Sequence, residues 1–253
     1  MARGMKSVRH ILSFGGGVNS VALMIILLRS KEPLDEVVFA DTGAEAPETY
    51  AYLHLVNPYL RDHRVSFTIL ANQTRGPDLY GRCWDRRVIP SALWRWSTRD
   101  FKVTPIHRYY RSLGGHVNQY LAIAYDEVER MKDARVNYVT NFYPLVDRRI
   151  TRAGCIGLIE DAGLPVPPKS GCFFCPFNSI GRWRWLYRTH PQLYQEAVAL
   201  EENSKHFPSQ RLTDQVFRDR AKITLRQLGA ILESDPNLPP EEEQVPCGAE
   251  CMT

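Results

Sequence analysis

The sequence predicts an α/β fold with a doubly wound, mostly parallel sheet, because strand-like and helix-like segments alternate along the chain. Short apolar segments typical of buried strands recur through the first 140 residues, and segments with helical spacing of apolar residues lie between them. Alternation of this kind is typical of a parallel sheet with helices on both faces. After residue 150 the patterns are helical, which predicts a helical C-terminal region.

The first half of the chain contains the expected strands. They are predicted at residues 8–14, 36–40, 65–70, 119–124 and 136–139. Helices are expected directly after Gly17, from Pro47, which suits the first turn of a helix, and from Thr104 to Arg111. Residues 72–103 show no clear period, so we expect an irregular segment there.

The second half is predicted to be helical. Thr151 begins one helix, and Gly163-Leu164-Pro165 ends it. After a loop rich in proline and cysteine, apolar spacing predicts helices at about 180–188, 191–203 and 222–233. From Ser234 onward Pro and Glu dominate, which predicts a flexible tail. We therefore expect an α/β domain over 1–150, a helical cysteine-bearing subdomain over 151–233 and a tail over 234–253.

Composition excludes several classes of protein. Among the 253 residues, 44% are hydrophobic and 24% charged, as in ordinary globular proteins, and no apolar run is long enough to cross a membrane. The N-terminus has basic residues without a separate apolar region or cleavage site, so we expect a cytoplasmic protein with no membrane partner. The six cysteines are then not expected to form a disulfide framework.

Two stretches combine arginine with aromatic residues. Residues 82–111 carry seven arginines and one lysine among tryptophans and tyrosines, and residues 182–188 read Arg-Trp-Arg-Trp-Leu-Tyr-Arg. Arginine together with aromatic rings suits phosphates and stacked bases, which points to nucleic acid as one partner. The alternative is a solvated face whose tryptophans pack inward.

Three glycines, Gly15, Gly16 and Gly17, stand between the first strand and the first helix. Glycines at such a turn allow the backbone to approach a ligand, and the helix N-terminus adds unpaired N–H groups and partial positive charge. The turn therefore predicts a phosphate site, with a tight turn without ligand as the alternative. Neither the Walker A pattern nor G-x-G-x-x-G is present.

The glycine turn resembles the PP-loop, S-G-G-x-D-S, of ATP pyrophosphatases and adenine nucleotide alpha hydrolases. Gly15 stands where Ser is usual and Asn19 where Asp is usual, while Ser20 keeps the final hydroxyl. The resemblance implies that Ser13, Gly15, Gly16, Gly17, Asn19 and Ser20 bind ATP or another adenine nucleotide. Because Asn19 removes a carboxylate from the loop, the binding of Mg²⁺, which is one expected cofactor, and the cleavage of ATP stay open at this point.

A second segment extends the resemblance. Asp41-Thr42-Gly43 follows the second strand, and the run from Asp41 to Tyr50 closely matches D-T-G-x-x-x-P-E-T-Y of phosphoadenosine phosphosulfate (PAPS) reductases. The resemblance implies that these three residues approach the adenosine, with PAPS as one nucleotide to consider. Taken alone, the segment could be a capped βα loop, with Asp41 capping the helix.

Further matches to the PAPS reductase-like group follow in the same order, so that the resemblance covers residues 7–178. Residues 97–105 resemble C-T-R-x-x-K-x-x-P, which makes Arg99 and Lys102 candidate phosphate or sulfate clamps. Residues 122–130 resemble G-I-R-x-D-E/Q…R, where Arg130 either pins an acidic substrate or pairs with a neighbouring carboxylate. Tyr143-Pro144-Leu145 and Gly171-Cys172-Phe173-Phe174-Cys175 complete the set.

Cysteines suggest a metal centre. Cys172 and Cys175 form C-x-x-C, Cys155 lies upstream, and Cys83 could supply a fourth ligand. Related sulfur-transfer enzymes use a 4Fe-4S cluster, which the resemblance makes the expected cofactor. Zinc and free redox thiols are the alternatives, and Cys83 could equally be an ordinary buried thiol.

The tail adds Cys247 and Cys251. Assimilatory PAPS reductases carry a nucleophilic cysteine in such a tail, and two tethered thiols could attack and then resolve as a disulfide. The alternative is a pair of incidental cysteines.

These features lead to three hypotheses. The first is ATP-dependent or adenylyl-linked sulfur transfer, with nucleic acid as one acceptor and a protein as one sulfur donor. The second is a PAPS reductase that uses Cys247 and Cys251 as thiols. The third is a protein that binds nucleotide or nucleic acid without catalysis.

Overall fold

A computed structural model describes residues 7–71, 78–91, 95–214 and 223–235. These residues form two compact units. The first unit consists of residues 7–71 and 100–171, and the second of residues 78–91, 95–99, 172–214 and 223–235. The predicted division of the chain at residues 150 and 233 stays a prediction, and the predicted tail lies largely outside the described residues.

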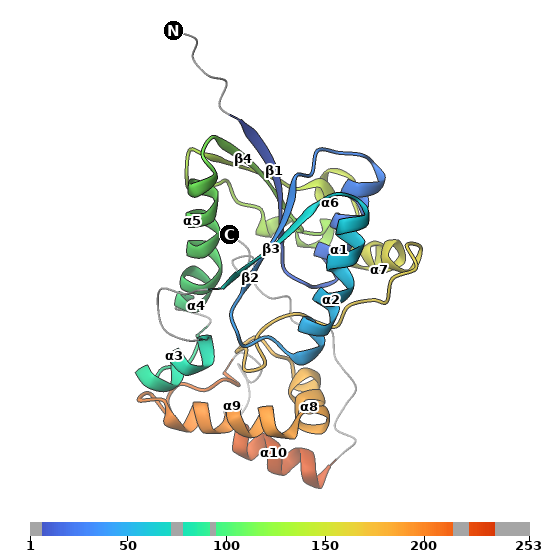
Figure 1. Ribbon diagram of the computed structural model, residues 1–253. Coiled ribbons are helices and arrows are strands. Elements are labelled where there is room, and N and C mark those ends of the chain that lie inside the picture. Colours follow the sequence, from blue (N-terminus) through green and yellow to red (C-terminus); the bar gives the residue numbers. More distant parts are fainter. Residues whose placement is uncertain (1–6, 72–77, 92–94, 215–222, 236–253) are drawn as a thin grey trace. The chain divides into compact units, whose positions relative to one another are not determined.

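The first unit is built on a parallel sheet of five strands in the order β3-β2-β1-β4-β5 (Figure 1). The strands are β1 (Val8–Phe14), β2 (Glu36–Asp41), β3 (Ser66–Ala71), β4 (His116–Leu121) and β5 (Val139–Phe142). Each pair of neighbours is parallel, so the predicted α/β class and parallel sheet are confirmed.

The last two strands lie away from their predicted positions. We predicted residues 119–124 and 136–139, whereas β4 begins at His116 and β5 begins at Val139. Polar residues occupy these strands because they bond across the sheet. His116 Nε2 lies 2.9 Å from Thr140 Oγ1, and Gln119 donates to Asn141 Oδ1 at 3.0 Å. A search for apolar runs therefore placed both strands too late or too early.

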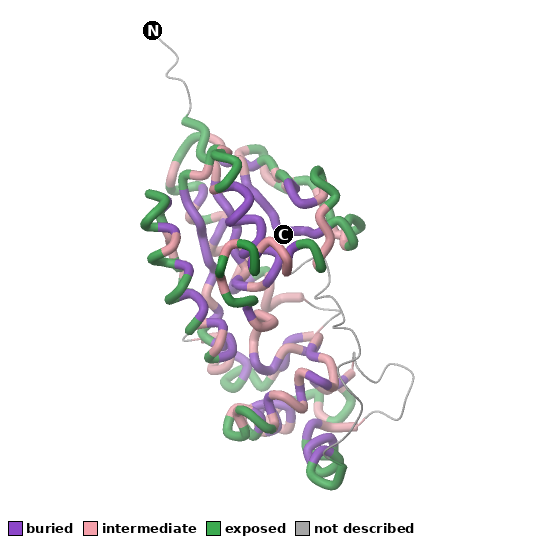
Figure 2. Tube along the Cα trace, turned by 90° about the vertical axis from the view of Figure 1, so that its right-hand side faces the viewer, coloured by how far each residue is buried: buried purple, intermediate pink, exposed green. Residues whose placement is uncertain are grey.

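Helices cover both faces of the sheet, as predicted. Leu12, Phe39 and their neighbours pack with α1 (Val18–Arg29), α2 (Pro47–Asp62) and α7 (Arg152–Glu160). Ile11 and Val38 point to the opposite face and pack with α5 (Thr104–Leu113). Figure 1 shows the strands between α5 and the α1–α2 pair, and Figure 2 shows buried strands with helices exposed on their outer sides.

Three shorter elements complete the first unit. They are η1 (Arg99–Val103), which begins at the boundary with the second unit, η2 (Tyr125–Arg130) and α6 (Pro144–Asp147). Residues 72–103 were expected to be irregular, and this prediction is wrong for α3 (Leu79–Arg86), α4 (Trp96–Thr98) and η1. The three buried residues of α3 are too few to show a helical period in the sequence; they are Leu79, Arg82 and Cys83. The helix begins at Asp78, whose carboxylate caps it by accepting from Gly81 N at 2.6 Å.

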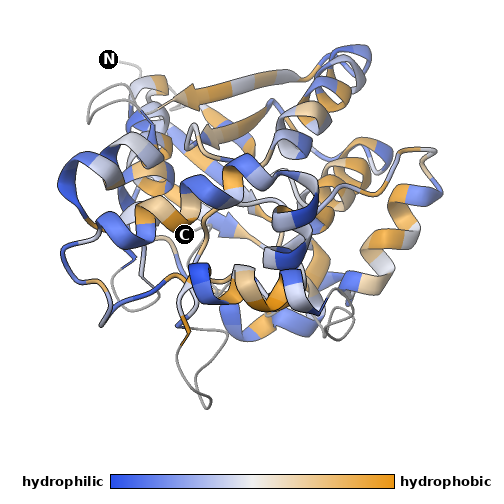
Figure 3. Cartoon of the chain, turned by 90° about the horizontal axis from the view of Figure 1, so that it is seen from below, coloured by the Kyte–Doolittle hydropathy of each residue, from blue (hydrophilic) through white to orange (hydrophobic). Residues whose placement is uncertain are grey.

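The second unit is helical, and its helices after residue 172 confirm the predicted helical C-terminal region. Besides α3 and α4 it contains α8 (Ile180–Thr189), α9 (Pro191–Asn203) and α10 (Leu225–Ser234). Hydrophobic and hydrophilic residues alternate along helices of the chain (Figure 3). Trp183 and Tyr194 are almost fully buried and meet edge to face, which fixes α8 against α9.

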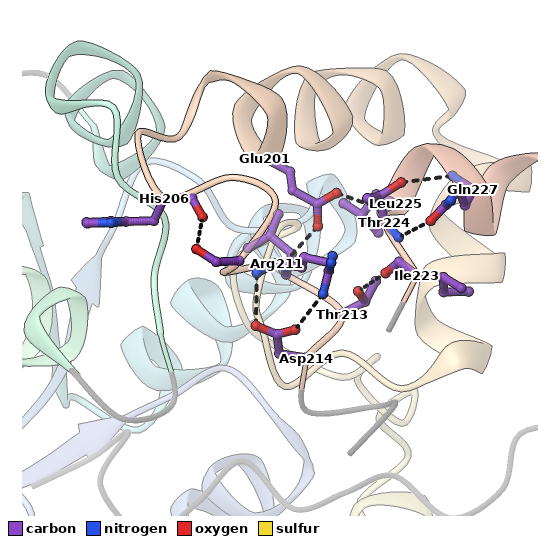
Figure 4. Close-up of polar contacts among 11 residues, drawn as sticks. Glu201, His206, Arg211, Thr213, Asp214, Ile223, Thr224, Leu225 and Gln227 are labelled. Carbon is purple, nitrogen blue, oxygen red and sulfur yellow. Dashed lines mark hydrogen bonds and ion pairs between the residues drawn. The ribbon is translucent and has the colours of Figure 1, made fainter. Parts of the chain in front are cut away.

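A buried carboxylate ties α9 to α10 (Figure 4). Glu201 is fully buried, and its two oxygens accept from Leu212 N at 2.9 Å and Leu225 N at 2.8 Å. Burial raises the pKa of Glu201 to about 7, although the two N–H donors and Arg211 oppose this shift and Asp214 adds to it. Both ends of the connection that leads into α10 are therefore held by one side chain.

Among the described residues, no helix is both long enough and apolar enough to cross a membrane.

Candidate functional site

The carboxyl ends of β1, β2 and β4 lie side by side, because these strands are neighbours in a parallel sheet. The segments that follow them are Gly15–Gly17, Thr42–Ala46 and Ala122–Ala124. In α/β sheets, ligands bind outside this edge. The residues predicted to bind a nucleotide therefore come from two adjacent loops of the first unit.

The glycine loop after β1 is closely packed at Gly16 and Gly17. Gly16 has φ +74°, and a Cβ there would lie 3.3 Å from Thr49 Cγ2. A Cβ on Gly17 would lie 2.8 Å from Ser170 Oγ. Position 16 therefore requires glycine for its left-handed conformation, and a side chain at Gly17 would have to displace the Ser170 hydroxyl.

The N-terminus of α1 retains the features of an anion site. Its N-cap residue, Gly17, supplies no side-chain hydrogen bond, and α1, which the structure describes throughout, has no acidic residue in its first turn. Ser20 Oγ donates to Gly17 O at 2.8 Å, so this hydroxyl fixes the loop to the helix. Ser13, at the end of β1, is buried beneath the loop. The first backbone N–H groups and the helix dipole would favour a phosphate.

Asn19 is held by a residue more than one hundred positions away in the chain. Its Nδ2 donates to Glu127 Oε2 at 2.9 Å, and the other oxygen of Glu127 is paired with Arg130. This pairing favours the ion-pair alternative for Arg130. Asn19 Oδ1 is buried and has no hydrogen-bond partner among the described residues. The loop thus keeps one buried acceptor unsatisfied.

In the loop after β2, by contrast, the side chains bond to one another. Asp41 Oδ1 accepts from Gly43 N and from Tyr50 Oη, both at 2.8 Å. Burial, together with Asp41, raises the pKa of Tyr50 well above its usual range. Thr42 Oγ1 accepts from Ala44 N at 3.3 Å. The side chains of Asp41 and Thr42 therefore maintain the loop, which leaves its backbone as the part that can face a ligand.

Lys102 reaches the loop after β2. Its Nζ lies 3.4 Å from Glu45 Oε1, and the Glu45 side chain is only 1% exposed. Arg99, the other predicted clamp, is exposed at the start of η1 and lies at the edge of the second unit. The structure thus brings Lys102 to the loop through Glu45, a residue to which the sequence analysis gave no role.

The four predicted metal ligands fall into both units. Cys155 belongs to the first unit and is buried, and burial raises the pKa of its thiol to about 12. Cys83, in the second unit, is equally buried with its pKa raised to about 12. Cys172 and Cys175 are partly exposed and joined by a turn, in which Cys175 N donates to Cys172 O at 3.0 Å.

Within the described part of the chain, no three His, Cys, Asp or Glu side chains gather to hold an ion. Burial as thiols also disfavours the thiolate form that metals require. The predicted cluster and zinc therefore stay predictions. Cys247 and Cys251 lie outside the described residues.

The arginine-rich stretches form stacks with aromatic rings inside the second unit. Arg82 lies 5.7 Å from the Trp96 ring centroid, and Arg95 lies 4.9 Å from that of Phe177. Arg182 stacks on Trp185 at 3.6 Å. Such stacks occur in nucleic-acid sites and equally within protein surfaces.

Several site residues had no predicted role. Thr49, Ser170 and Glu127 line or support the glycine loop. Glu127 lies in a stretch whose resemblance to known enzymes was noted, so the signal was present. Ser170 is brought to Gly17 by tertiary folding, and no local pattern marks it.

Three known proteins are similar to this chain. An uncharacterized protein from Methanocaldococcus jannaschii is 23% identical over 211 residues, which is 78% of this chain and 42% of that protein, so the chain spans about two fifths of this relative. The crystal structure of PAPS reductase from Candida auris matches with a TM-score of 0.45 and 14% identity, covering 67% of this chain and 82% of that one. U34-tRNA thiolase NcsA from Methanococcus maripaludis, with its 4Fe-4S cluster, matches with a TM-score of 0.45 and 12% identity, covering 78% and 72%.

The family is shown by a match to a sequence model. The phosphoadenosine phosphosulfate reductase domain matches residues 9–144, which is more than half of the chain and contains β1 to β5 and both loops of the candidate site. This chain belongs to the phosphoadenosine phosphosulfate reductase domain family, within the PP-loop group.

Proposed function

We propose that this protein is an enzyme that binds an adenine nucleotide at the glycine loop after β1 and uses it in sulfur transfer. The observation that carries the proposal is the loop itself. Gly16 adopts a left-handed conformation, a Cβ at Gly16 or Gly17 would press on Thr49 or Ser170, and the two glycines lead into a helix whose N-terminus has neither a side-chain cap nor an acidic residue in its first turn. Membership of the PAPS reductase domain family supports the nucleotide class.

Each part of the site has a role in the proposal. The N–H groups at the start of α1 bind phosphate oxygens, and the helix dipole stabilises their charge. The backbone of Asp41, Thr42 and Gly43 lines the adenosine, while their side chains keep the loop in shape. Lys102, held at Glu45, supplies a positive charge that binds a phosphate or sulfate group.

The acceptor of sulfur in the proposal is nucleic acid. The stacks of Arg95 on Phe177 and of Arg182 on Trp185 are the supporting contacts, since guanidinium groups and rings bind phosphates and bases. A bound 4Fe-4S cluster would supply sulfur or electrons, and Cys172 and Cys175, both partly exposed, are its first candidates in the second unit.

Calorimetric titration of the full chain with ATP, ADP and PAPS tests the binding step. We expect micromolar affinity for at least one of these nucleotides, and unmodified guanosine triphosphate serves as the control for base selectivity. Absence of binding to all three adenine nucleotides would rule out the proposal. Release of pyrophosphate on addition of RNA or DNA then tests activation of the nucleic acid by ATP. Release of AMP together with incorporation of sulfur, when sulfide is also added, tests transfer to nucleic acid.

A second candidate function is reduction of PAPS itself, which is favoured by the family match. In that case Cys247 and Cys251 act as thiols, and sulfite would be released from PAPS. Sulfite measured with wild type and with Cys247→Ser/Cys251→Ser separates the two functions. Production of sulfite that needs both thiols would favour the reductase.

The cluster is tested by anaerobic purification. A 4Fe-4S protein would be brown and contain about four irons per chain, and Cys172→Ala would lose them. A colourless preparation that contains zinc would favour the structural alternative.

A further inference from the structure

The side-chain amide of Asn19 is held in one orientation. Its Nδ2 donates to Glu127 Oε2 at 2.9 Å. Of the two ends of the Asn19 amide, only the NH2 group can donate to the carboxylate, so the opposite orientation would place the amide oxygen against a carboxylate oxygen. The other oxygen of Glu127 is held in an ion pair with Arg130. The amide oxygen of Asn19 is thereby turned away from Glu127.

This oxygen is a buried acceptor without a partner among the described residues. Asn19 is 9% exposed and lies in the first turn of α1, directly beside the glycine loop. A buried acceptor left unsatisfied lowers stability, so such groups in native proteins usually have a partner when the ligand is bound. The ionised oxygens of the phosphate that would bind at the loop accept hydrogen bonds and do not donate them. The phosphate therefore cannot be the partner of the Asn19 oxygen.

We propose that Glu127 is a positioning residue that locks the Asn19 amide, so that its oxygen receives an electropositive group of the bound nucleotide. That group is either a divalent cation carried by the phosphates or a hydroxyl of the nucleotide. The proposal rests on the proposed nucleotide site. It adds that the site binds a cation or a hydroxyl group of the nucleotide as well as the phosphates.

Exchange of the two side chains tests the lock. In Glu127→Gln, the single amide oxygen cannot accept from both Asn19 and Arg130, so we expect ATP affinity to fall about tenfold. In Asn19→Asp, a second carboxylate faces Glu127, and we expect a similar or larger loss. In the double variant, the new amide at position 127 donates to the new carboxylate at position 19 and accepts from Arg130, so affinity returns to within about threefold of wild type.

The source of the electropositive group is tested with Asn19→Leu, which keeps the branched shape of the side chain and removes both the acceptor and the N–H group that donates to Glu127. Titrations with ATP are made in Mg²⁺ and in EDTA. If the oxygen binds a cation, the variant loses the enhancement by Mg²⁺ and keeps the affinity measured in EDTA. If it binds a hydroxyl, affinity falls by about tenfold in both solutions. Either result supports the role of the Asn19 oxygen, whereas the exchange of side chains tests the lock by Glu127.

Two controls make the test specific. Glu129→Gln changes an exposed residue of the same short helix, and Asn57→Leu changes an exposed residue of α2, so both should bind ATP as wild type does. Thermal melting confirms that each variant is folded at the temperature of titration. If wild type binds ATP and Asn19→Leu binds it equally in both solutions, the inference is overturned and the nucleotide site remains. The inference is also overturned if the fold loss of ATP affinity in the double variant equals the product of the losses in the two single variants. If wild type binds no adenine nucleotide, the proposed function itself fails.

Discussion

The loops after β1 and β2 end neighbouring parallel strands, yet they treat their polar groups in opposite ways. Around β2, Asp41 is bonded to Gly43 and Tyr50, so its carboxylate is used within the loop. After β1, the helix begins without a side-chain cap and the Asn19 oxygen is buried without a partner among the described residues. In the proposal, a ligand completes the β1 loop, whereas the side chains of the β2 loop already bond within the loop.

The largest expected effect comes from filling the β1 loop. Gly16→Val places a branched side chain at φ +74° against Thr49, so we expect ATP affinity to fall about 1,000-fold, or about 4 kcal/mol. Calorimetry measures the loss. Gly157→Val is the matched control, because a Cβ at Gly157 in α7 meets no atom within 4 Å. Normal binding by Gly16→Val would remove the contrast between the two loops.

The next effect concerns a satisfied polar group in the second unit. The pKa of Glu201 is raised from 4.5 to about 7, so its contribution to stability is complete below pH 4.5 and is lost as pH rises through 7. The shift corresponds to about 3 kcal/mol of unfolding free energy.

Denaturant unfolding between pH 5 and 8 measures this loss. Glu201→Gln should be less stable at low pH, because the NH2 end of the new amide cannot accept from a backbone N–H. The variant should also lack the decline with pH, because an amide does not titrate in this range. A flat wild-type profile would contradict the prediction. If stability declines with pH while the ATP affinity of Glu201→Gln equals that of wild type, Glu201 stabilises the fold and takes no part in binding. It would then resemble the polar groups of the β2 loop.

A third effect is expected at Glu45, which is buried beside Lys102. Lys102→Met leaves this carboxylate with less compensation, so we expect a loss of about 2 kcal/mol of stability together with weaker nucleotide binding. Glu45→Gln in the same chain should restore stability but not binding, since the positive charge is still absent.

Thermal melting and calorimetry separate the two readouts. Arg226→Met, at an exposed ion pair with Glu202, is the control and should leave both nearly unchanged. Recovery of binding in the double variant would show that Lys102 acts only on structure.

The smallest effect is expected in the β2 loop. Asp41→Asn keeps an oxygen that can accept from both Gly43 and Tyr50 and loses only the negative charge that strengthens these hydrogen bonds, so stability should fall by about 1 kcal/mol. Nucleotide affinity should change less than about threefold, because the backbone rather than the carboxylate faces the ligand in the proposal. Asp133→Asn, at an exposed residue, is the control. A tenfold loss of affinity at Asp41 would place its carboxylate on the ligand and end the contrast.

Local chemistry made much of the fold predictable. Apolar strands of β-branched and aromatic residues, and Pro47 at the start of α2, identified β1, β2, α1 and α2 close to their observed bounds. β4 and β5 were displaced because their polar residues, such as Gln119 and Asn141, pair across strands. Elements stabilised by distant partners leave little trace in local hydropathy.

The candidate site shows the same division. The sequence by itself determined the glycine turn, the residues after β2 and the family, since turns that approach phosphates need glycine at fixed positions. Only the tertiary structure decided that Ser170 covers Gly17, that Lys102 meets Glu45 and that Glu127 holds Asn19. The physical reason is that these contacts join residues 57 to 153 positions apart, and the sheet order, rather than any local pattern, brings such residues together.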